Sequence, residues 1–213
     1  MTARSPEQGI VAPLSTEVKQ LVRIAGAIAG SNEETVRAVM SEAAGVDPVA
    51  VDEIIIQSYL FAGFPRALNA ARAWRTISGK PAPERDSESD AADLETWRER
   101  GLRTCKIVYG ESYEALRRNI RKLHPALDEW MIVDGYGKVV SRGGVDLRTR
   151  ELCVVAACAV AGQQRQLHSH LHGALNAGAT LDEVRAALDA IGDLIRADDL
   201  AKYHQLLAKV ATQ

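Results

Sequence analysis

The sequence lacks the features that mark membrane proteins and nucleic-acid-binding proteins. No apolar run approaches the roughly 20 residues that a membrane-spanning helix requires, and the opening stretch MTARSPEQGIVAP has no apolar core like that of a signal peptide. The 26 Lys and Arg residues are balanced by 28 Asp and Glu residues, so the net charge of -2 gives no general attraction to phosphate backbones or anionic lipid. We therefore expect a cytoplasmic protein that binds neither membranes nor nucleic acid.

Cysteine is also scarce. The chain has three, an odd number that is typical of a reduced compartment. Cys153 and Cys158 are five positions apart, so on a helix they point about 140° away from each other and cannot form a CxxC-type redox pair. Cys105 is far from both in the sequence. We expect all three to be small buried side chains.

Helical periodicity, by contrast, is present along most of the chain. Apolar residues recur at helical spacing, and no segment has the convincing two-residue alternation of a strand. Thr180 with Glu183 three residues later is typical of a helix N-terminus. The predicted class is all-α, with helices at 15–29, 32–44, 50–62, 65–77, 146–161, 164–177 and 180–195 and a further helix over ADDLAKYHQLLAKV.

The chain is expected to have two unequal helical halves. The segment GKPAPERDSESDAADLE is rich in Pro, Ser and acidic residues and lacks an apolar period, which predicts a solvated linker. After it, further helix is expected, followed by a Gly-rich irregular stretch around Tyr136, Gly143 and Gly144. The predicted divisions are a flexible arm (1–14), a first half (15–79), the linker (80–96) and a second half (97–213).

The second half contains GQQRQLHSHLHGALNAGAT, with histidines at alternate positions. Its apolar residues lie three and four apart, which predicts a helix, so His170 faces the apolar side while His168 and His172 share the opposite face. Three imidazoles cannot converge from these positions. An i,i+4 zinc pair on the outer face lacks an HExxH-type glutamate or a third ligand, so no metal site is predicted. His170 is then either a core residue or part of a site.

Glu151 lies on the apolar stripe of the preceding predicted helix. A buried carboxylate is costly unless it has a partner or is protonated. Two helices joined by a short turn pack antiparallel, so Glu151 can approach His170, and a buried carboxylate beside an imidazole is suited to proton transfer. The alternative is an ion pair between Glu151 and Arg148 or Arg150.

At these residues the sequence resembles the carboxymuconolactone decarboxylase and AhpD-like superfamily. The matching stretches are DLRTRELCVVAACAVAG, LHSHLHGALNAGATLDEV and, in the first half, QSYLFAGFPRALNAARAW. In the thiol-active branch a glutamate, the two cysteines of CxxC and a histidine follow at fixed spacing. Glu151 and His170 occupy the glutamate and histidine positions here, whereas Gln163 and Gln166 replace the cysteines. This combination resembles the decarboxylase branch, which uses no redox cysteines.

The resemblance implies an AhpD-like helical bundle with two internally duplicated halves and no cofactor. In the duplication Glu17 corresponds to Glu151, while Val36 stands where the second copy has His170. The first copy is therefore expected to be degenerate, and the second copy to carry the site. Apolar residues nearly all round the stretch EIIIQSYLFAG, together with the resemblance, predict a homo-oligomer, either a trimer or a hexamer.

The leading functional hypothesis is a cofactor-independent lyase or isomerase that acts on a carboxylated lactone or a similar small organic acid. His170 would donate the proton and Glu151 would set its tautomer. Substrate-binding candidates are two residues at the lost cysteine positions, a tyrosine in the Gly-rich stretch and arginines that suit a carboxylate: Gln163, Gln166, Tyr136, Arg142, Arg148 and Arg150.

Two other functions are considered. One is an alkylhydroperoxidase or disulfide reductase, which the missing CxxC argues against because resolving chemistry needs a second nearby thiol. The other is a catalytically inactive oligomeric or ligand-binding protein, in which Glu151 and His170 are core groups. An imidazole sealed inside a fully packed core would favour the inactive protein.

Overall fold

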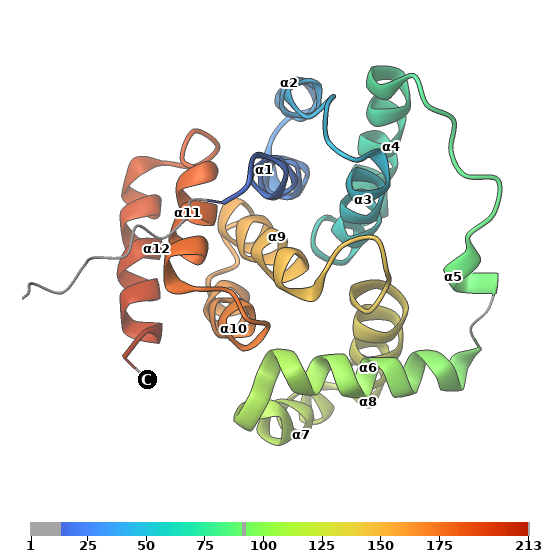
Figure 1. Ribbon diagram of the computed structural model, residues 1–213. Helices are drawn as coiled ribbons and strands as arrows, with labels where there is room; N and C mark the ends of the chain where they lie inside the picture. Colours follow the sequence, from blue (N-terminus) through green and yellow to red (C-terminus); the bar gives the residue numbers. More distant parts are fainter. Residues whose placement is uncertain (1–13, 91–92, 213) are drawn as a thin grey trace, which may run out of the picture.

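The computed structural model describes residues 14–90 and 93–212, and these residues form helices and no strand (Figure 1). The predicted all-α class is thus confirmed. Residues 1–13, which make up nearly all of the predicted N-terminal arm, lie outside the described residues, as do residues 91–92 and 213. Among the described helices, none is both long enough and apolar enough to cross a membrane.

The helices follow one another with short connections, and their N-termini use the expected capping residues. Asp146 accepts a hydrogen bond from the amide of Thr149, and Thr180 and Glu183 form the predicted capping box. The described helices are α1 (Thr16–Gly30), α2 (Glu33–Glu42), α3 (Pro48–Ala62), α4 (Phe64–Ser78), α5 (Ser87–Asp90), α6 (Leu94–Tyr109), η1 (Gly110–Ser112), α7 (Tyr113–Leu123), α8 (Pro125–Trp130), η2 (Met131–Val140), α9 (Leu147–Val160), α10 (Gln164–Asn176), α11 (Leu181–Ala190) and α12 (Ala197–Val210).

One predicted boundary is wrong by five residues. The helix expected over 180–195 ends at Ala190, and a turn leads into α12. Arg23 of α1 explains the early end, because it donates a hydrogen bond of 2.7 Å to the Ala190 carbonyl and pairs with Asp193 in the turn. A cation from a distant helix therefore satisfies the end of α11, and nothing in the local sequence indicates this.

The irregular stretch predicted around Tyr136 is also wrong. Tyr136 lies in η2, a π-helix that continues from α8. The glycines that suggested irregular backbone instead allow α6 to approach closely: a Cβ at Gly137 would lie 1.9 Å from the Trp97 carbonyl oxygen, and one at Gly101 would lie 2.0 Å from that of Ile132. Irregular backbone is confined to the residues around Gly143 and Gly144.

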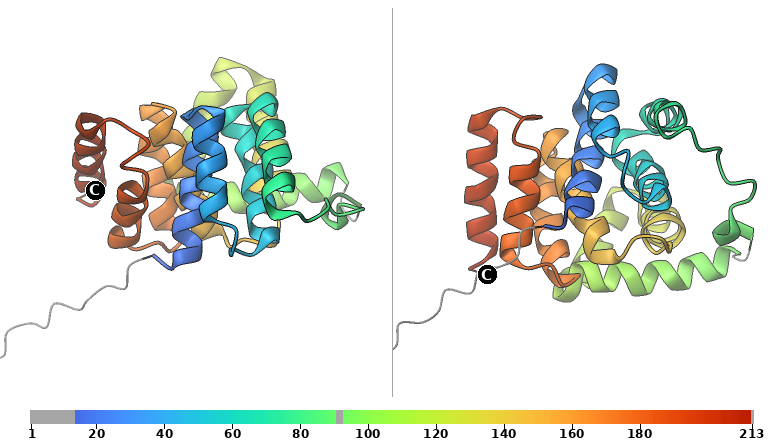
Figure 2. Two further views of the ribbon diagram at one scale, coloured as in Figure 1. Left: turned by 90° about the horizontal axis from the view of Figure 1, so that it is seen from above. Right: turned by 45° about the horizontal axis from the view of Figure 1, so that its top comes forward.

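The two halves of the chain share one hydrophobic core. That core draws its buried residues from α1–α4 and from α9–α12, while a smaller cluster joins α6, α7 and η2. Helix α9 lies near the middle, with α1, α3 and α10 packed beside it (Figures 1 and 2). Each residue from Leu152 to Ala159 is at most 3% exposed. The candidate glutamate is thus carried on the most enclosed helix.

The predicted linker follows the outer edge of the molecule from α4 to α6 (Figure 1). Part of it is helical, because α5 and the first turn of α6 fall within residues 80–96. Its acidic residues also have partners elsewhere in the chain: Asp86 pairs with Arg142, and Glu88 pairs with Arg100. These ion pairs hold the segment against the second half.

Candidate active site

His170 and Glu151 are in direct contact. The Nδ1 atom of His170 lies 2.8 Å from Oε2 of Glu151, and the two residues are 6% and 0% exposed. Neither Arg148 nor Arg150 pairs with Glu151, since these arginines bind Glu183 and Glu53 instead. The alternative ion pair considered for Glu151 is therefore wrong. Because an ionised carboxylate only accepts hydrogen bonds, this contact places the proton of the neutral imidazole on Nδ1.

Gly173 makes room for the carboxylate. A Cβ at Gly173 would lie 2.6 Å from Glu151 Oε2 and 2.7 Å from a methyl group of Val108. Asn176, one turn later on α10, donates a 2.9 Å hydrogen bond to the Val108 carbonyl and so ties α10 to α6. Gly173 and Asn176, both in the stretch HGALN, therefore help to position the His170–Glu151 pair.

The second carboxylate oxygen of Glu151 is available. Glu151 Oε1 is buried and has no hydrogen-bond partner within the described residues. An unpaired buried carboxylate oxygen costs free energy unless a bound group or water satisfies it. Glu151 and His170 both line a cavity of about 1190 Å³, which opens to the surface at exposed residues such as Leu123 and Trp130. The imidazole therefore borders open space rather than a sealed core.

Aromatic rings surround the imidazole. The rings of Phe61 and Tyr109 meet His170 edge-on at centroid distances of 5.9 and 6.2 Å, and Tyr136 meets Tyr109 at 6.1 Å. Burial raises the pKa of Tyr109 to about 12 and that of Tyr136 well above its usual value. Both phenols stay protonated at neutral pH. Their side chains share a hydrogen bond that raises the pKa of Tyr136 and lowers that of Tyr109, so Tyr136 is the donor of this bond and the Tyr109 hydroxyl is left to donate into the cavity.

Some predicted binding residues reach the cavity. Tyr136, Gln163 and Gln166 line it, as do Arg165 and Lys138, two cations that the sequence did not single out. Gln166 lies one turn before His170 and shares its face of α10, whereas Arg165 lies five positions before His170, so helical spacing gave no signal for it. Tyr109 and Phe61 come from α6 and α3, and no sequence pattern places them beside α10.

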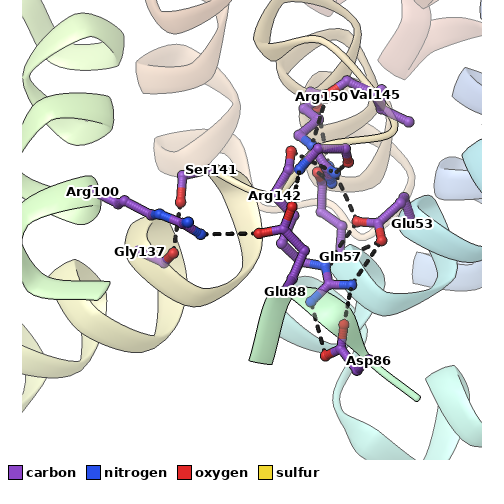
Figure 3. Close-up of polar contacts among 11 residues, drawn as sticks. Glu53, Gln57, Asp86, Glu88, Arg100, Gly137, Ser141, Arg142, Val145 and Arg150 are labelled. Carbon is purple, nitrogen blue, oxygen red and sulfur yellow. Dashed lines mark hydrogen bonds and ion pairs between the residues drawn. The ribbon is translucent and has the colours of Figure 1, made fainter. Parts of the chain in front are cut away.

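Arg142 and Arg150 do not reach the cavity, so their prediction as substrate ligands is wrong. Figure 3 shows Arg142 between Glu53 and Asp86, with Arg150 approaching the same glutamate from α9. Arg150 is 0% exposed and bonds to Glu53 at 2.8 Å and to the Gly143 carbonyl at 2.8 Å. The carboxylate that these arginines bind belongs to the protein, on a helix about a hundred residues earlier in the chain.

The other two histidines lie on the far side of α10. The rings of His168 and His172 meet at 5.1 Å, and both residues are half-buried. Within residues 14–90 and 93–212, no group of three or more His, Cys, Asp or Glu side chains is placed to hold a metal ion.

The cysteines are free and buried. Burial raises the pKa of Cys105 and Cys158 to about 12 and raises that of Cys153 further. Cys158 lines the cavity, yet its raised pKa disfavours the thiolate that peroxide or disulfide chemistry requires. The cavity therefore presents an imidazole and a carboxylate rather than an activated thiol.

Comparison with known proteins agrees with this geometry. Residues 129–195 match the carboxymuconolactone decarboxylase family, and the matched stretch contains Tyr136, Glu151 and His170. The chain is also 32% identical, over 137 residues, to Peroxisomal protein 2 of Schizosaccharomyces pombe. That alignment spans 63% of this chain and 63% of the yeast protein. The predicted resemblance to the carboxymuconolactone decarboxylase family is thus confirmed for residues 129–195, which carry the site.

Proposed function

We propose that the protein is a cofactor-independent lyase or isomerase, which transfers a proton to carbon in a carboxylated lactone or a similar organic acid. The observation that carries the proposal is the His170–Glu151 pair, buried at the wall of a large cavity. The family's description refers to a decarboxylase, which supports this reaction class. The yeast relative's name refers to the peroxisome and to no reaction, so it does not choose a substrate.

The pair can serve decarboxylation in the following way. The bond from carbon to the carboxylate breaks, carbon dioxide leaves, and the electron pair moves into a conjugated carbonyl of the substrate. Protonated His170 then delivers the Nε2 proton to carbon, while Nδ1–H stays bonded to Glu151. The imidazole recovers its proton from solvent. Glu151 fixes the ring and stabilises its charged form during this cycle.

Substrate binding is assigned to cavity residues rather than to the arginines of the Glu53 cluster. Arg165 and Lys138 supply positive charge at the cavity wall, and Gln163 and Gln166 supply amides. Tyr109, which stays protonated and shares a hydrogen bond with Tyr136, is suited to donate to the carbonyl oxygen where negative charge develops.

A catalytically inactive ligand-binding protein is the second candidate. A sealed imidazole would have favoured this candidate, and the cavity beside His170 removes that support.

Assembly into a trimer or hexamer stays a prediction. The prediction rests on the apolar surface of α3, and much of that surface is buried within the chain. Ile54 is 0% and Ile55 4% exposed, whereas Ile56 is 38% exposed. Light scattering should return a mass well above 23.1 kDa.

The proposal is tested by screening carboxylated lactones and unsaturated or oxo acids with the purified chain, in the presence of a chelator. Release of carbon dioxide or uptake of solvent deuterium at carbon is expected for at least one acid. Failure of the whole panel, or activity only after zinc is added, would count against a cofactor-independent reaction.

The predicted cytoplasmic location is checked by imaging a fluorescent fusion, with the peroxisome as the alternative compartment.

A further inference from the structure

The cavity beside His170 is larger than a small lactone acid requires. Its volume of about 1190 Å³ exceeds the roughly 300 to 1,000 Å³ typical of sites that enclose a drug-sized ligand. A small acid would occupy a fraction of this space and leave the apolar wall in contact with water. The volume therefore indicates a ligand with a substantial body beyond its reacting group.

The rim of the cavity is polar at the start of α10, where Gln163, Arg165 and Gln166 are exposed, and apolar along α7 and α8. Glu151, His170 and Tyr136 are at most 6% exposed, so they form the inner end. The rim contains Leu123 and Trp130, which are 76% and 60% exposed. Large apolar side chains with such exposure are costly to leave in water, and here they lie on the wall of the same cavity as the reactive pair.

Helix α7 supplies much of this wall. Leu116, Ile120 and Leu123 share one face of the helix at helical spacing, and all three line the cavity. The polar side of α7 is occupied, since Arg117 and Arg121 both bind Asp128. Tyr113 is the buried residue of this helix, and Leu116 packs in part against the smaller core cluster. Towards the end of α7, Ile120 and Leu123 line the cavity and belong to neither core cluster.

We propose that the site takes an organic acid with a long apolar chain or ring system, the reacting end at His170 and the apolar body along α7 and α8. This substrate class rests on the proposed function for the reacting end alone. Continuity of the apolar wall with the His170 cavity favours a ligand over a second copy of the chain as the occupant. The cavity is lined by two cations, Arg165 and Lys138, and two carboxylates, Asp134 and Glu151, so the acidic end of the ligand is taken from the proposed function and its apolar body from this wall.

Equilibrium dialysis of the full chain against hexanoate, octanoate, decanoate and dodecanoate, below their micelle concentrations, tests the proposal. Affinity should rise about threefold to fourfold for each added methylene group, because each is transferred from water to an apolar wall. The double variant Ile120→Gln/Leu123→Gln should weaken dodecanoate binding by roughly tenfold or more and reduce the dependence on chain length. Leu68→Gln is the matched control, since Leu68 is 53% exposed on α4 and lies outside the cavity.

Affinity that does not change with chain length, or that falls equally in Leu68→Gln, would overturn the proposal. Light scattering of the double variant gives the other decisive outcome: conversion of a larger assembly to single chains would show that a second copy covers this wall. His170→Gln should keep the dependence on chain length. If it does while no acid is turned over by the wild type, the proposed reaction fails and the ligand class stands.

Discussion

The two helical corners of the molecule, α1–α2 and α9–α10, differ in the residues that face their cavities. The second corner presents His170 and Glu151 to a space of about 1190 Å³. In the first corner Val36 lines a cavity of about 370 Å³, and Glu17, the expected counterpart of Glu151, is exposed. The duplication itself stays a prediction. Two helices that meet at a corner beside a cavity are therefore not enough to make the candidate site. Only the second of these corners places an inward imidazole beside a buried carboxylate.

The glycine at the second corner sharpens the difference. In the predicted duplication, in which Glu17 corresponds to Glu151, the position that corresponds to Gly173 is Val39. Val39 is 3% exposed. A buried valine suits a corner that holds no carboxylate, whereas Gly173 leaves space that Glu151 fills. If the halves are duplicated as predicted, the second corner has the smaller side chain at the position where its carboxylate and imidazole meet.

The largest expected effect on stability concerns the charges that anchor the second corner. Glu53→Leu leaves Arg150 buried without its carboxylate, so the free energy of unfolding should fall by about 3–5 kcal/mol. Urea denaturation measures it. Asp182→Asn, which breaks an exposed pair with Arg185, should cost less than about 1 kcal/mol. Equal effects of the two variants would show that the Glu53 cluster does not anchor α9.

Gly173→Ala is expected to have the next largest effect. The added methyl group meets Glu151 Oε2 at 2.6 Å, so unfolding free energy should fall by about 1–3 kcal/mol, and displacement of the carboxylate should slow turnover by roughly 10². Gly45→Ala is the control, because a Cβ there meets nothing within 4 Å. A Gly173→Ala protein with full activity would contradict the role given to this glycine.

The thiols should be inert in the folded protein. With the pKa of Cys105 and Cys158 raised to about 12, the thiolate form stays rare until the pH approaches that value. A thiol reagent at pH 8 should react only after denaturation. Cys158→Ser should leave turnover within a few-fold of wild type. Turnover abolished in that variant would mean that the second corner works through sulfur.

The smallest expected effect concerns the predicted linker, whose Asp86 pairs with Arg142. Arg142 lowers the pKa of Asp86 to about 2, from 3.8 in an unfolded chain. The stability from this contact is therefore present above pH 4 and is lost as the pH falls from 4 towards 2. Asp86→Asn should remove this part of the acid dependence in a denaturation series. An unchanged acid profile would show that the contact does not stabilise the fold.

Local pattern was enough to predict α1 to α4, α9 and α10 and the approach of Glu151 to His170, because helical spacing and a short turn determine them. It was not enough for contacts between distant segments. Arg150 pairs with Glu53 rather than with a substrate, and Arg23 ends α11 early. The glycines near Tyr136 serve helix packing, which cannot be distinguished from a loop until Trp97 is placed against them.

The most direct test of the account is to measure turnover and unfolding free energy together in His170→Gln, with His168→Gln as the outward control. Glutamine keeps much of the volume and hydrogen bonding but cannot supply the proton, so turnover should fall by roughly 10² to 10⁴ while stability changes little. His168→Gln should stay within a few-fold of wild type. Unfolding of His170→Gln would show that the imidazole is a core group, and full activity in a stable His170→Gln would show that the reaction occurs elsewhere.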